Sequence, residues 1–239
     1  MLNNKPILEG RARRPVYAWF FCLAFAQVSG VTIEFAPAPG VRSDVSRPIR
    51  VACVGDSITR GHGIPNLETH SYPALLGRLL GPGYDVRNFG HDGTTMLSGS
   101  GRPYRSVAEF QAATDFQPDI VVIMLGTNDA HPPLWQKARA RFADDCRAMI
   151  DYFAGLPISP QIWLCLPAPL IPGRDDERMA NLRDHIVPQL RAVANEKQVG
   201  LIDVQSSLEG KPELFPDKVH PNAAGAAIIA ETVARAIRP

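Results

Sequence analysis

The stretch IRVACVGDSITRG, residues 49–61, decides the class of fold. Its first half is apolar on nearly consecutive positions, as expected for a strand whose two faces are both covered. Its second half begins with turn and cap residues, so the strand runs through a glycine into a helix. Ser57 stands at this junction. Taken by itself, such a serine is most simply the N-cap of the helix, and the alternative is a nucleophile.

Four further apolar runs repeat the first half of this pattern. They are YDVRNFG at 84–90, DIVVIMLG at 119–126, QIWLCLP at 161–167 and VGLIDV at 199–204. Apolar residues at helical spacing lie between them, over residues 72–80, 106–116, 135–153, 179–193 and 222–237. Pro188 should kink or split the fourth of these helices, and Pro221 suits the first position of the last one.

This alternation of strands and helices predicts the architecture. Short connections between strands and helices favour a mainly parallel sheet with helices on both faces. We therefore expect residues 49–239 to form a three-layer α/β/α domain, doubly wound around a five-stranded sheet. In such a sheet, ligands bind at the carboxyl ends of the strands.

The composition narrows the classes of partner. The chain has 239 residues, of which 45% are hydrophobic, enough for one globular domain with a substantial core. Lys and Arg number 25 against 24 Asp and Glu, so no broad basic surface is expected for nucleic acid or for an anionic membrane. A small molecule is the favoured partner, and the oligomeric state stays open.

The first thirty residues differ from the rest of the chain. Three arginines between positions 11 and 14 precede the apolar run Val16–Val28, which is followed by Ser29 and Gly30. This order predicts a signal peptide over residues 1–30, and therefore a secreted or periplasmic protein. The run has about 13 residues, short of the roughly 20 that a span needs, and an uncleaved membrane anchor is the alternative. Residues 31–48, rich in proline, read as a linker or N-terminal arm.

Three cysteines remain once that segment is set aside. Cys53, Cys146 and Cys165 are an odd number at wide spacings, which fits neither a disulfide framework nor a zinc site. All three sit among apolar residues, so buried free thiols are expected.

Polar residues follow three of the predicted strands, at the edge where a ligand should bind. The clusters are Gly55-Asp56-Ser57, Asn88-Phe89-Gly90 and Gly126-Thr127-Asn128-Asp129, and a fourth, at residues 215–222, precedes the last helix. Together they supply a hydroxyl at Ser57, an imidazole at His220 and a carboxylate three residues earlier at Asp217. Gly90 and Asn128 add possible hydrogen-bond donors. These are the groups that serine-based acyl transfer requires.

The order of these blocks, GDS, then Gly90, then GTND, then DxxH, resembles the SGNH or GDSL-type hydrolase family. The resemblance spans Gly55 to His220 and implies the flavodoxin-like fold of that family. It also implies that Ser57 is the nucleophile, His220 the general base and Asp217 its orienting partner. The oxyanion hole would consist of the Ser57 N–H, Gly90 and Asn128, with no cofactor and no metal.

The chain departs from the family pattern in two places. Ile58 replaces the leucine of the namesake motif, a conservative exchange, and His91-Asp92 follows Gly90 where relatives often carry small or hydroxyl residues. The candidate substrate contacts are Asp56, His91, Asp92, Asp129 and Tyr104. Asp56 has an alternative as a structural hydrogen-bonding residue beside the serine, and Asp129 as a residue bonded to nearby backbone. Arg102 could meet a carboxylate, and Trp135 either stacks on a sugar or packs on the apolar face of its helix.

Several stretches, among them VRNFGHDGTTML and GKPELFPDKVHPNAAGA, are similar to secreted bacterial sialate O-acetylesterase-like or carbohydrate acetylesterase members. The resemblance implies a small-molecule or glycan ester substrate and removal of acetyl groups from sugar hydroxyls. Two alternatives remain: a lysophospholipase or thioesterase of the same fold, and a non-catalytic carbohydrate-binding relative.

Overall fold

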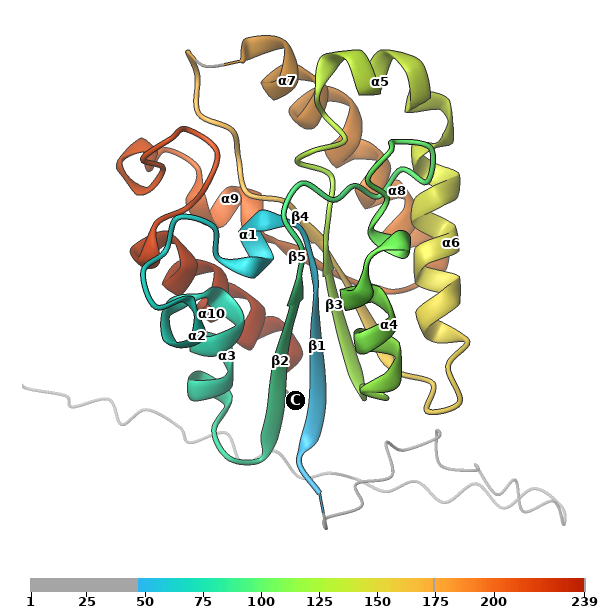
Figure 1. The fold of residues 1–239 in the computed structure, drawn as a ribbon, viewed down its shortest axis with the longest axis vertical. Helices are drawn as coiled ribbons and strands as arrows, with labels where there is room; N and C mark the ends of the chain where they lie inside the picture. The colour runs from blue at the N-terminus through green and yellow to red at the C-terminus, as the bar shows by residue number, and fades with distance from the viewer. Residues whose placement is uncertain (1–46, 174, 239) are drawn as a thin grey trace, which may run out of the picture. The chain divides into compact units, whose positions relative to one another are not determined.

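A parallel five-stranded sheet organises the protein. The computed structural model describes residues 47–173 and 175–238, and within them the strand order is β2-β1-β3-β4-β5, with every pairing parallel (Figure 1). The strands are β1 (Ile49–Gly55), β2 (Tyr84–Gly90), β3 (Ile120–Met124), β4 (Gln161–Leu166) and β5 (Gly200–Asp203). This is the flavodoxin-like order, and it reverses at β1, which lies between β2 and β3. The predicted doubly wound α/β/α fold is confirmed.

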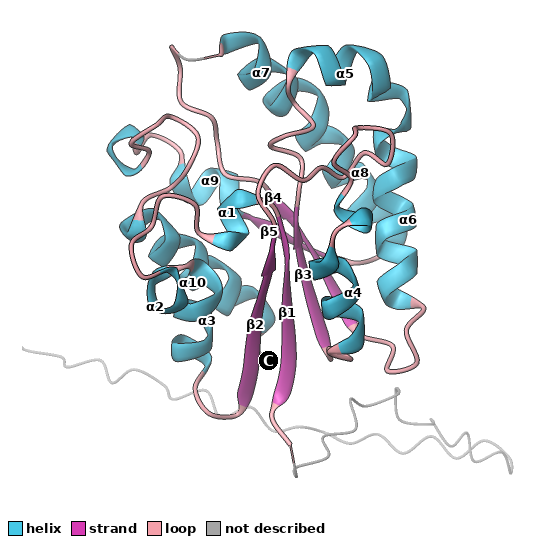
Figure 2. Cartoon of the chain, in the orientation of Figure 1, coloured by secondary structure: helices cyan, strands magenta, loops and turns pink. Residues whose placement is uncertain are grey.

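Helices cover both faces of this sheet (Figure 2). Helices α3 and α10 pack on one face, and α4, α6 and α8 pack on the other. The α-helices are α1 (Ser57–Arg60), α2 (Leu67–His70), α3 (Tyr72–Leu80), α4 (Ala108–Asp115), α5 (Pro132–Ala138), α6 (Phe142–Ala154), α7 (Asp176–Asn181), α8 (Val187–Lys197), α9 (Val204–Leu208) and α10 (Ala223–Ile237). Short 3-10 turns occupy Tyr104–Ser106, Arg139–Arg141 and Pro212–Leu214, and a π-helical turn occupies Leu182–Ile186.

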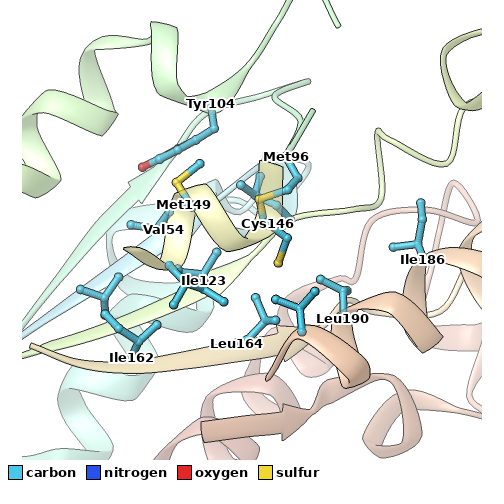
Figure 3. Close-up of a cluster of buried hydrophobic side chains, with 14 of the residues drawn as sticks. Val54, Met96, Tyr104, Ile123, Cys146, Met149, Ile162, Leu164, Ile186 and Leu190 are labelled. Atoms are coloured by element: carbon cyan, nitrogen blue, oxygen red, sulfur yellow. The ribbon is translucent and has the colours of Figure 1, made fainter. Parts of the chain in front are cut away.

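The core is divided in two by the sheet because side chains alternate along each strand. In β1, Ala52 and Val54 face one helical layer, whereas Val51 and Cys53 face the other. Figure 3 shows the first of these clusters, in which sheet side chains such as Ile123 meet residues of α6 and α8. Burial on both faces explains why the strands read as continuous apolar runs.

The cysteines follow the sequence-based expectation. Cys53, Cys146 and Cys165 are all buried and free. Burial raises the pKa of the Cys53 and Cys146 thiols to about 12, so neither forms a reactive thiolate near neutral pH.

Two predicted helices are interrupted. The single helix expected over residues 135–153 is wrong, because the backbone at Ala138 leaves helical geometry (φ −124°) and a 3-10 turn separates α5 from α6. The split near Pro188 is confirmed: the π-helical turn ends at Ile186, and Pro188 lies in the first turn of α8, where a missing N–H costs little.

The predictions for the N-terminus lie largely outside this part of the chain. Both the signal segment, residues 1–30, and nearly all of the arm, residues 31–48, precede the described residues. Between residues 47 and 238, apart from position 174, no helix combines the length and the apolar character needed to cross a membrane.

Candidate active site

The carboxyl ends of β1, β2 and β3 meet at one edge of the sheet. Gly55, the last residue of β1, is paired with Gly90 of β2 and with Met124 of β3. The residues that follow these strands therefore emerge side by side, as the sequence predicted.

Ser57 begins the one-turn helix α1, and the residue before it caps that helix. The Asp56 carboxylate accepts the N–H of Ile58 at 2.9 Å, which makes Asp56 the N-cap. The helix ends at Gly61, whose left-handed backbone (φ 97°) suits glycine. Because Asp56 supplies the cap, the Ser57 hydroxyl is left to bond elsewhere, and the interpretation of Ser57 as the N-cap is wrong.

His220 provides the partner of that hydroxyl. Its Nε2 lies 2.9 Å from the Ser57 Oγ, and its Nδ1 lies 2.6 Å from the Asp217 Oδ2. An ionised Asp217 can only accept, so Nδ1 carries the ring proton, Nε2 is unprotonated, and the Ser57 hydroxyl donates to it. Three residues from opposite ends of the domain thus form a continuous hydrogen-bonded chain.

The turn before α10 holds Asp217 and His220 in place. The backbone N–H groups of Val219 and His220 both donate to the Asp217 Oδ1, at 3.0 and 2.7 Å. Asn222 caps α10 by accepting two backbone N–H groups, so Pro221 precedes the cap and the prediction that it opens the helix is wrong.

The same contacts keep Asp217 ionised. Partial burial by itself would raise the pKa of this carboxyl, but hydrogen bonds from the His220 backbone and ring, and from Val219, hold it well below its ordinary value. The Asp217 carboxylate is therefore negative near neutral pH.

The side-chain amide of Asn128 is held in one orientation by the turn that follows β2 and by Arg178. Its Nδ2 donates to the Thr94 carbonyl at 2.9 Å, and its Oδ1 accepts from Arg178 Nη2 at 3.2 Å. Arg178 also donates twice to the Thr127 carbonyl, at 3.0 and 2.8 Å. An amide nitrogen carries two protons, so one N–H of Asn128 stays available to a ligand.

Gly90 does not take the role predicted for it. Its N–H donates to the Asn88 side chain at 2.9 Å, and a Cβ at this position would lie 2.2 Å from the Arg60 backbone nitrogen. The prediction of Gly90 as an oxyanion donor is therefore wrong: the glycine allows β2 to pack against α1.

Gly93, three residues later, is a better candidate that the sequence reasoning missed. It has a left-handed backbone (φ 76°), and its N–H makes no hydrogen bond within the described part of the chain. It precedes Thr94, whose carbonyl holds Asn128. The Asp92-Gly93 pair is a strong turn signal that could have drawn attention to this position.

His91 and Asp92 line a cavity next to this turn. The cavity measures about 300 Å³ and is lined by His91, Asp92, Thr94, Gly101, Arg102, Ser106 and Val107. Asp92 also bonds to Arg60 at 2.5 Å and to His62 at 3.2 Å, and the ring of His62 packs on that of His220, with 4.4 Å between centroids. Both predicted contacts are thus placed where a ligand can reach them.

Three other predicted substrate contacts are buried, and those predictions are wrong. Asp129 accepts the backbone N–H groups of Met96 and Leu97, so it orders a loop, and burial raises its pKa to about 6. Asp56 is the α1 cap, and burial raises its pKa to about 7. Tyr104 is fully buried and donates to the Phe89 carbonyl. Trp135 is buried as well, which leaves no ring face for a sugar.

Tyr104→Phe should lower the free energy of unfolding by about 1–3 kcal/mol, because the buried Phe89 carbonyl loses the hydroxyl that donates to it at 2.6 Å. Urea unfolding measures this change. The KM of any substrate should stay within twofold of wild type. A raised KM with unchanged stability would instead support the sequence prediction that Tyr104 contacts the substrate.

A second cavity lies beside the His220 turn. It measures about 210 Å³ and is lined by His131, Leu170, Ile171, Asp175, Arg178, Lys218 and Val219. Val219 precedes His220 in the chain, and Arg178 holds Asn128, so this cavity is linked to the site through these two residues. Both cavities are small and have charged as well as apolar residues in their linings. Their volumes lie at or below the lower end of the range for ligand pockets, about 300–1,000 Å³.

The arrangement suits nucleophilic acyl transfer. A hydroxyl, an imidazole that can take its proton and an ionised carboxylate are aligned, and the Ser57 N–H, the Gly93 N–H and the second N–H of the Asn128 amide remain available as donors for a developing oxyanion. In residues 47–173 and 175–238, no group of three or more histidine, cysteine or acidic side chains is arranged to hold a metal ion.

Known proteins with similar sequences and structures carry esterase names. The chain is 36% identical over 227 aligned positions to an acetylxylan esterase of Xylanibacter ruminicola, an alignment that covers 87% of this chain and 46% of that protein. The chain thus spans slightly less than half the length of this curated relative.

Two solved structures share the fold. A carbohydrate acetylesterase family member from Sinorhizobium meliloti superposes with a TM-score of 0.67, at 23% identity, over 80% of this chain and 97% of that one. The aryl esterase of M. smegmatis gives 0.61, at 20% identity, over 79% and 100%. A family model described as the GDSL-like Lipase/Acylhydrolase family matches residues 53–228, a span that contains Ser57, Asn128, Asp217 and His220. By sequence, fold and the arrangement of these residues, the chain belongs to the GDSL-like Lipase/Acylhydrolase family.

Proposed function

We propose that this protein is a serine esterase that removes acetyl groups from the hydroxyls of carbohydrates. Ser57 attacks the ester carbonyl while His220 takes its proton, and Asp217 orients and stabilises the resulting imidazolium. The alcohol leaves with a proton from His220. In the second half-reaction His220 takes a proton from a water molecule that attacks the acetyl-enzyme, acetate leaves, and the proton returns to the Ser57 Oγ. The observation that carries this proposal is the unbroken hydrogen-bonded chain from Ser57 through His220 to Asp217.

The donors around Ser57 complete the mechanism. We assign the oxyanion hole to the Ser57 N–H, the Gly93 N–H and the second N–H of the Asn128 amide, none of which makes a hydrogen bond within the described residues. Because these donors are fixed before the substrate arrives, they stabilise the transition state without reorganisation.

The volume of the cavities and the name of a relative indicate the acyl group and the alcohol of the substrate. Cavities of about 300 and 210 Å³, both with charged side chains in their linings, suit an acetyl group and a single sugar ring better than a long acyl chain. The name of the Xylanibacter relative, acetylxylan esterase, supports a polysaccharide as the source of the ester.

The direct test is acetate release. The purified protein should release acetate from acetylated xylan and hydrolyse p-nitrophenyl acetate at least about tenfold faster, in kcat/KM, than p-nitrophenyl octanoate. A preference for octanoate or for lysophospholipids would favour a lipid or thioester hydrolase instead. An absence of hydrolysis of every ester would favour a carbohydrate-binding relative.

Asn128→Ala should lower kcat about 10²–10³-fold, with a small change in KM, because the lost amide binds the oxyanion more strongly than the neutral carbonyl. Steady-state kinetics with p-nitrophenyl acetate measures the split. Asn195→Ala, an exposed asparagine on α8, is the control and should keep the wild-type rate. A rise in KM with kcat intact would assign Asn128 to substrate binding.

We also propose that residues 1–30 direct export and are removed. The support is the order of arginines, apolar run and small residues at Ser29 and Gly30. Protein recovered outside the cytoplasm should begin at Val31 by N-terminal sequencing. Recovery in the membrane fraction with the N-terminal segment retained would establish the anchor in place of the signal peptide.

A further inference from the structure

The guanidinium of Arg102 is one of two that have no partner among the described residues. In residues 47–173 and 175–238, only Arg102 and Arg139 have a guanidinium with no hydrogen bond, ion pair or aromatic ring among the described residues. Arg139 is exposed on the turn between α5 and α6 and lines neither of the cavities described above. Arg102 lines the cavity of about 300 Å³.

The backbone that carries Arg102 is anchored. Its carbonyl accepts the N–H of Thr95 at 3.1 Å, and its own N–H donates to the Ser100 hydroxyl at 3.1 Å. The next turn is held by the buried Tyr104, whose N–H donates to the Thr95 carbonyl. A side chain that starts from a fixed backbone loses less entropy when it binds a ligand.

The guanidinium lies against the turn that joins the cavity to Ser57. A Cβ on Gly93 would lie 3.0 Å from Arg102 Nη1, so the cation covers the outer side of that glycine. Thr94, the next residue, lines the same cavity and holds Asn128 with its carbonyl. The backbone N–H of His91 completes the link by donating to the Gly55 carbonyl, two residues before Ser57.

The other charges around this cavity already have partners. Asp92 Oδ2 bonds to Arg60 and His62, although the buried Oδ1 has no hydrogen-bond partner among the described residues, and His91 Nδ1 lies 2.9 Å from Glu109. Among the charged residues that line this cavity, Arg102 is therefore the one without a counter-ion in the described part of the chain. An anion on a bound substrate would supply it.

We propose that this cavity binds the carboxylate of an acidic sugar, and that Arg102 thereby selects acetyl esters of hexuronic acids over those of neutral sugars. The planar fork of a guanidinium matches a carboxylate through two parallel hydrogen bonds. A volume of about 300 Å³ suits one sugar ring. This assignment rests on the proposed esterase function and adds the substrate class to it.

The test compares two substrates that differ only in charge. They are O-acetylated methyl glucuronoside as the free acid and as its carboxamide, with p-nitrophenyl acetate as a reference that lacks the sugar. Wild type should prefer the acid at least about tenfold in kcat/KM, mostly through KM, which corresponds to about 1.4 kcal/mol. The preference should shrink as NaCl rises from about 0.05 to 0.5 M, because the site is open to solvent.

Arg102→Gln should reduce this preference, the ratio of kcat/KM for the acid to kcat/KM for the amide, to near unity. Arg102→Lys should keep part of the preference, because it keeps the charge but not the fork. Arg139→Gln is the matched control and should keep all of it. Equal use of acid and amide by wild type, or a preference that survives Arg102→Gln, overturns the carboxylate site.

Binding of unacetylated methyl glucuronoside separates this inference from the esterase function. Calorimetric titration should show tighter binding of the acid than of the amide to wild type, and no difference for Arg102→Gln. A protein that binds the acid in this way but hydrolyses no ester would end the esterase proposal and keep the carboxylate site. An active esterase without this difference would end the carboxylate site alone.

Discussion

Ser57→Ala is expected to lower kcat for acetyl esters by about 10⁴–10⁶-fold, the range found when the serine of a hydrogen-bonded serine–histidine–aspartate group is removed. The physical reason is that no acyl-enzyme can form, so only binding and the oxyanion donors remain. Steady-state kinetics with p-nitrophenyl acetate measures the loss. An organophosphonate probe should add its mass to the wild-type protein at Ser57 and should add nothing to the variant.

The control for this change is Ser207→Ala. Ser207 lies in α9, where its hydroxyl donates to the Val204 carbonyl, and its loss should leave the rate within twofold of wild type. Since Asp56 rather than Ser57 caps α1, Ser57→Ala should also leave the free energy of unfolding within about 1 kcal/mol of wild type. A variant that keeps more than a hundredth of the activity would remove Ser57 from the mechanism.

Asp217→Asn should be nearly as severe, with a loss in kcat of about 10⁴-fold. The amide nitrogen of Asn can donate to His220 Nδ1, which would place the ring proton on Nε2, so that the ring could no longer take the Ser57 proton. The strong link at 2.6 Å between Asp217 and His220 would also lose its charge. The measurement is kcat from pH 5 to 9, with mass spectrometry to exclude deamidation back to Asp.

Asp203→Asn is a suitable comparison for that variant. Asp203 also accepts a backbone N–H, from Ser206, and pairs with an arginine, but it lies at the end of β5 beside α9. Asparagine caps helices about as well as aspartate, so the fold should persist and the rate should match wild type. If Asp217→Asn retained a tenth of the wild-type kcat, another group would have to orient His220.

The lowered pKa of Asp217 links the stability of the folded protein to pH. A carboxyl whose pKa is lower in the folded than in the unfolded protein contributes stability that is complete above its ordinary pKa and is lost as the pH falls through the lowered value. The Asp217 carboxylate should therefore keep its charge, and its contact with His220, below the ordinary pKa of an aspartate.

Much of the fold followed from the local pattern of residues. Apolar runs on both faces, as in β1 and β3, can be satisfied only inside a covered parallel sheet, and this fixed the layers and the edge at which polar residues meet. The break at Ala138 escaped prediction because the apolar spacing continues across it, from Trp135 in α5 to Phe142 in α6, and a change of backbone angle leaves no mark on that spacing.

The site divides in a similar way. The sequence by itself determined which residues could form the chain from Ser57 to His220 and Asp217, because each block stands at a strand end or before a helix and carries a chemically distinctive group. Only the tertiary structure decided which neighbours are open to a ligand. Burial excludes Tyr104 and Asp129 as substrate contacts. Gly90 is excluded as an oxyanion donor because its N–H donates to the Asn88 side chain. Those outcomes depend on contacts between segments distant in the chain, and spacing along the sequence does not encode them.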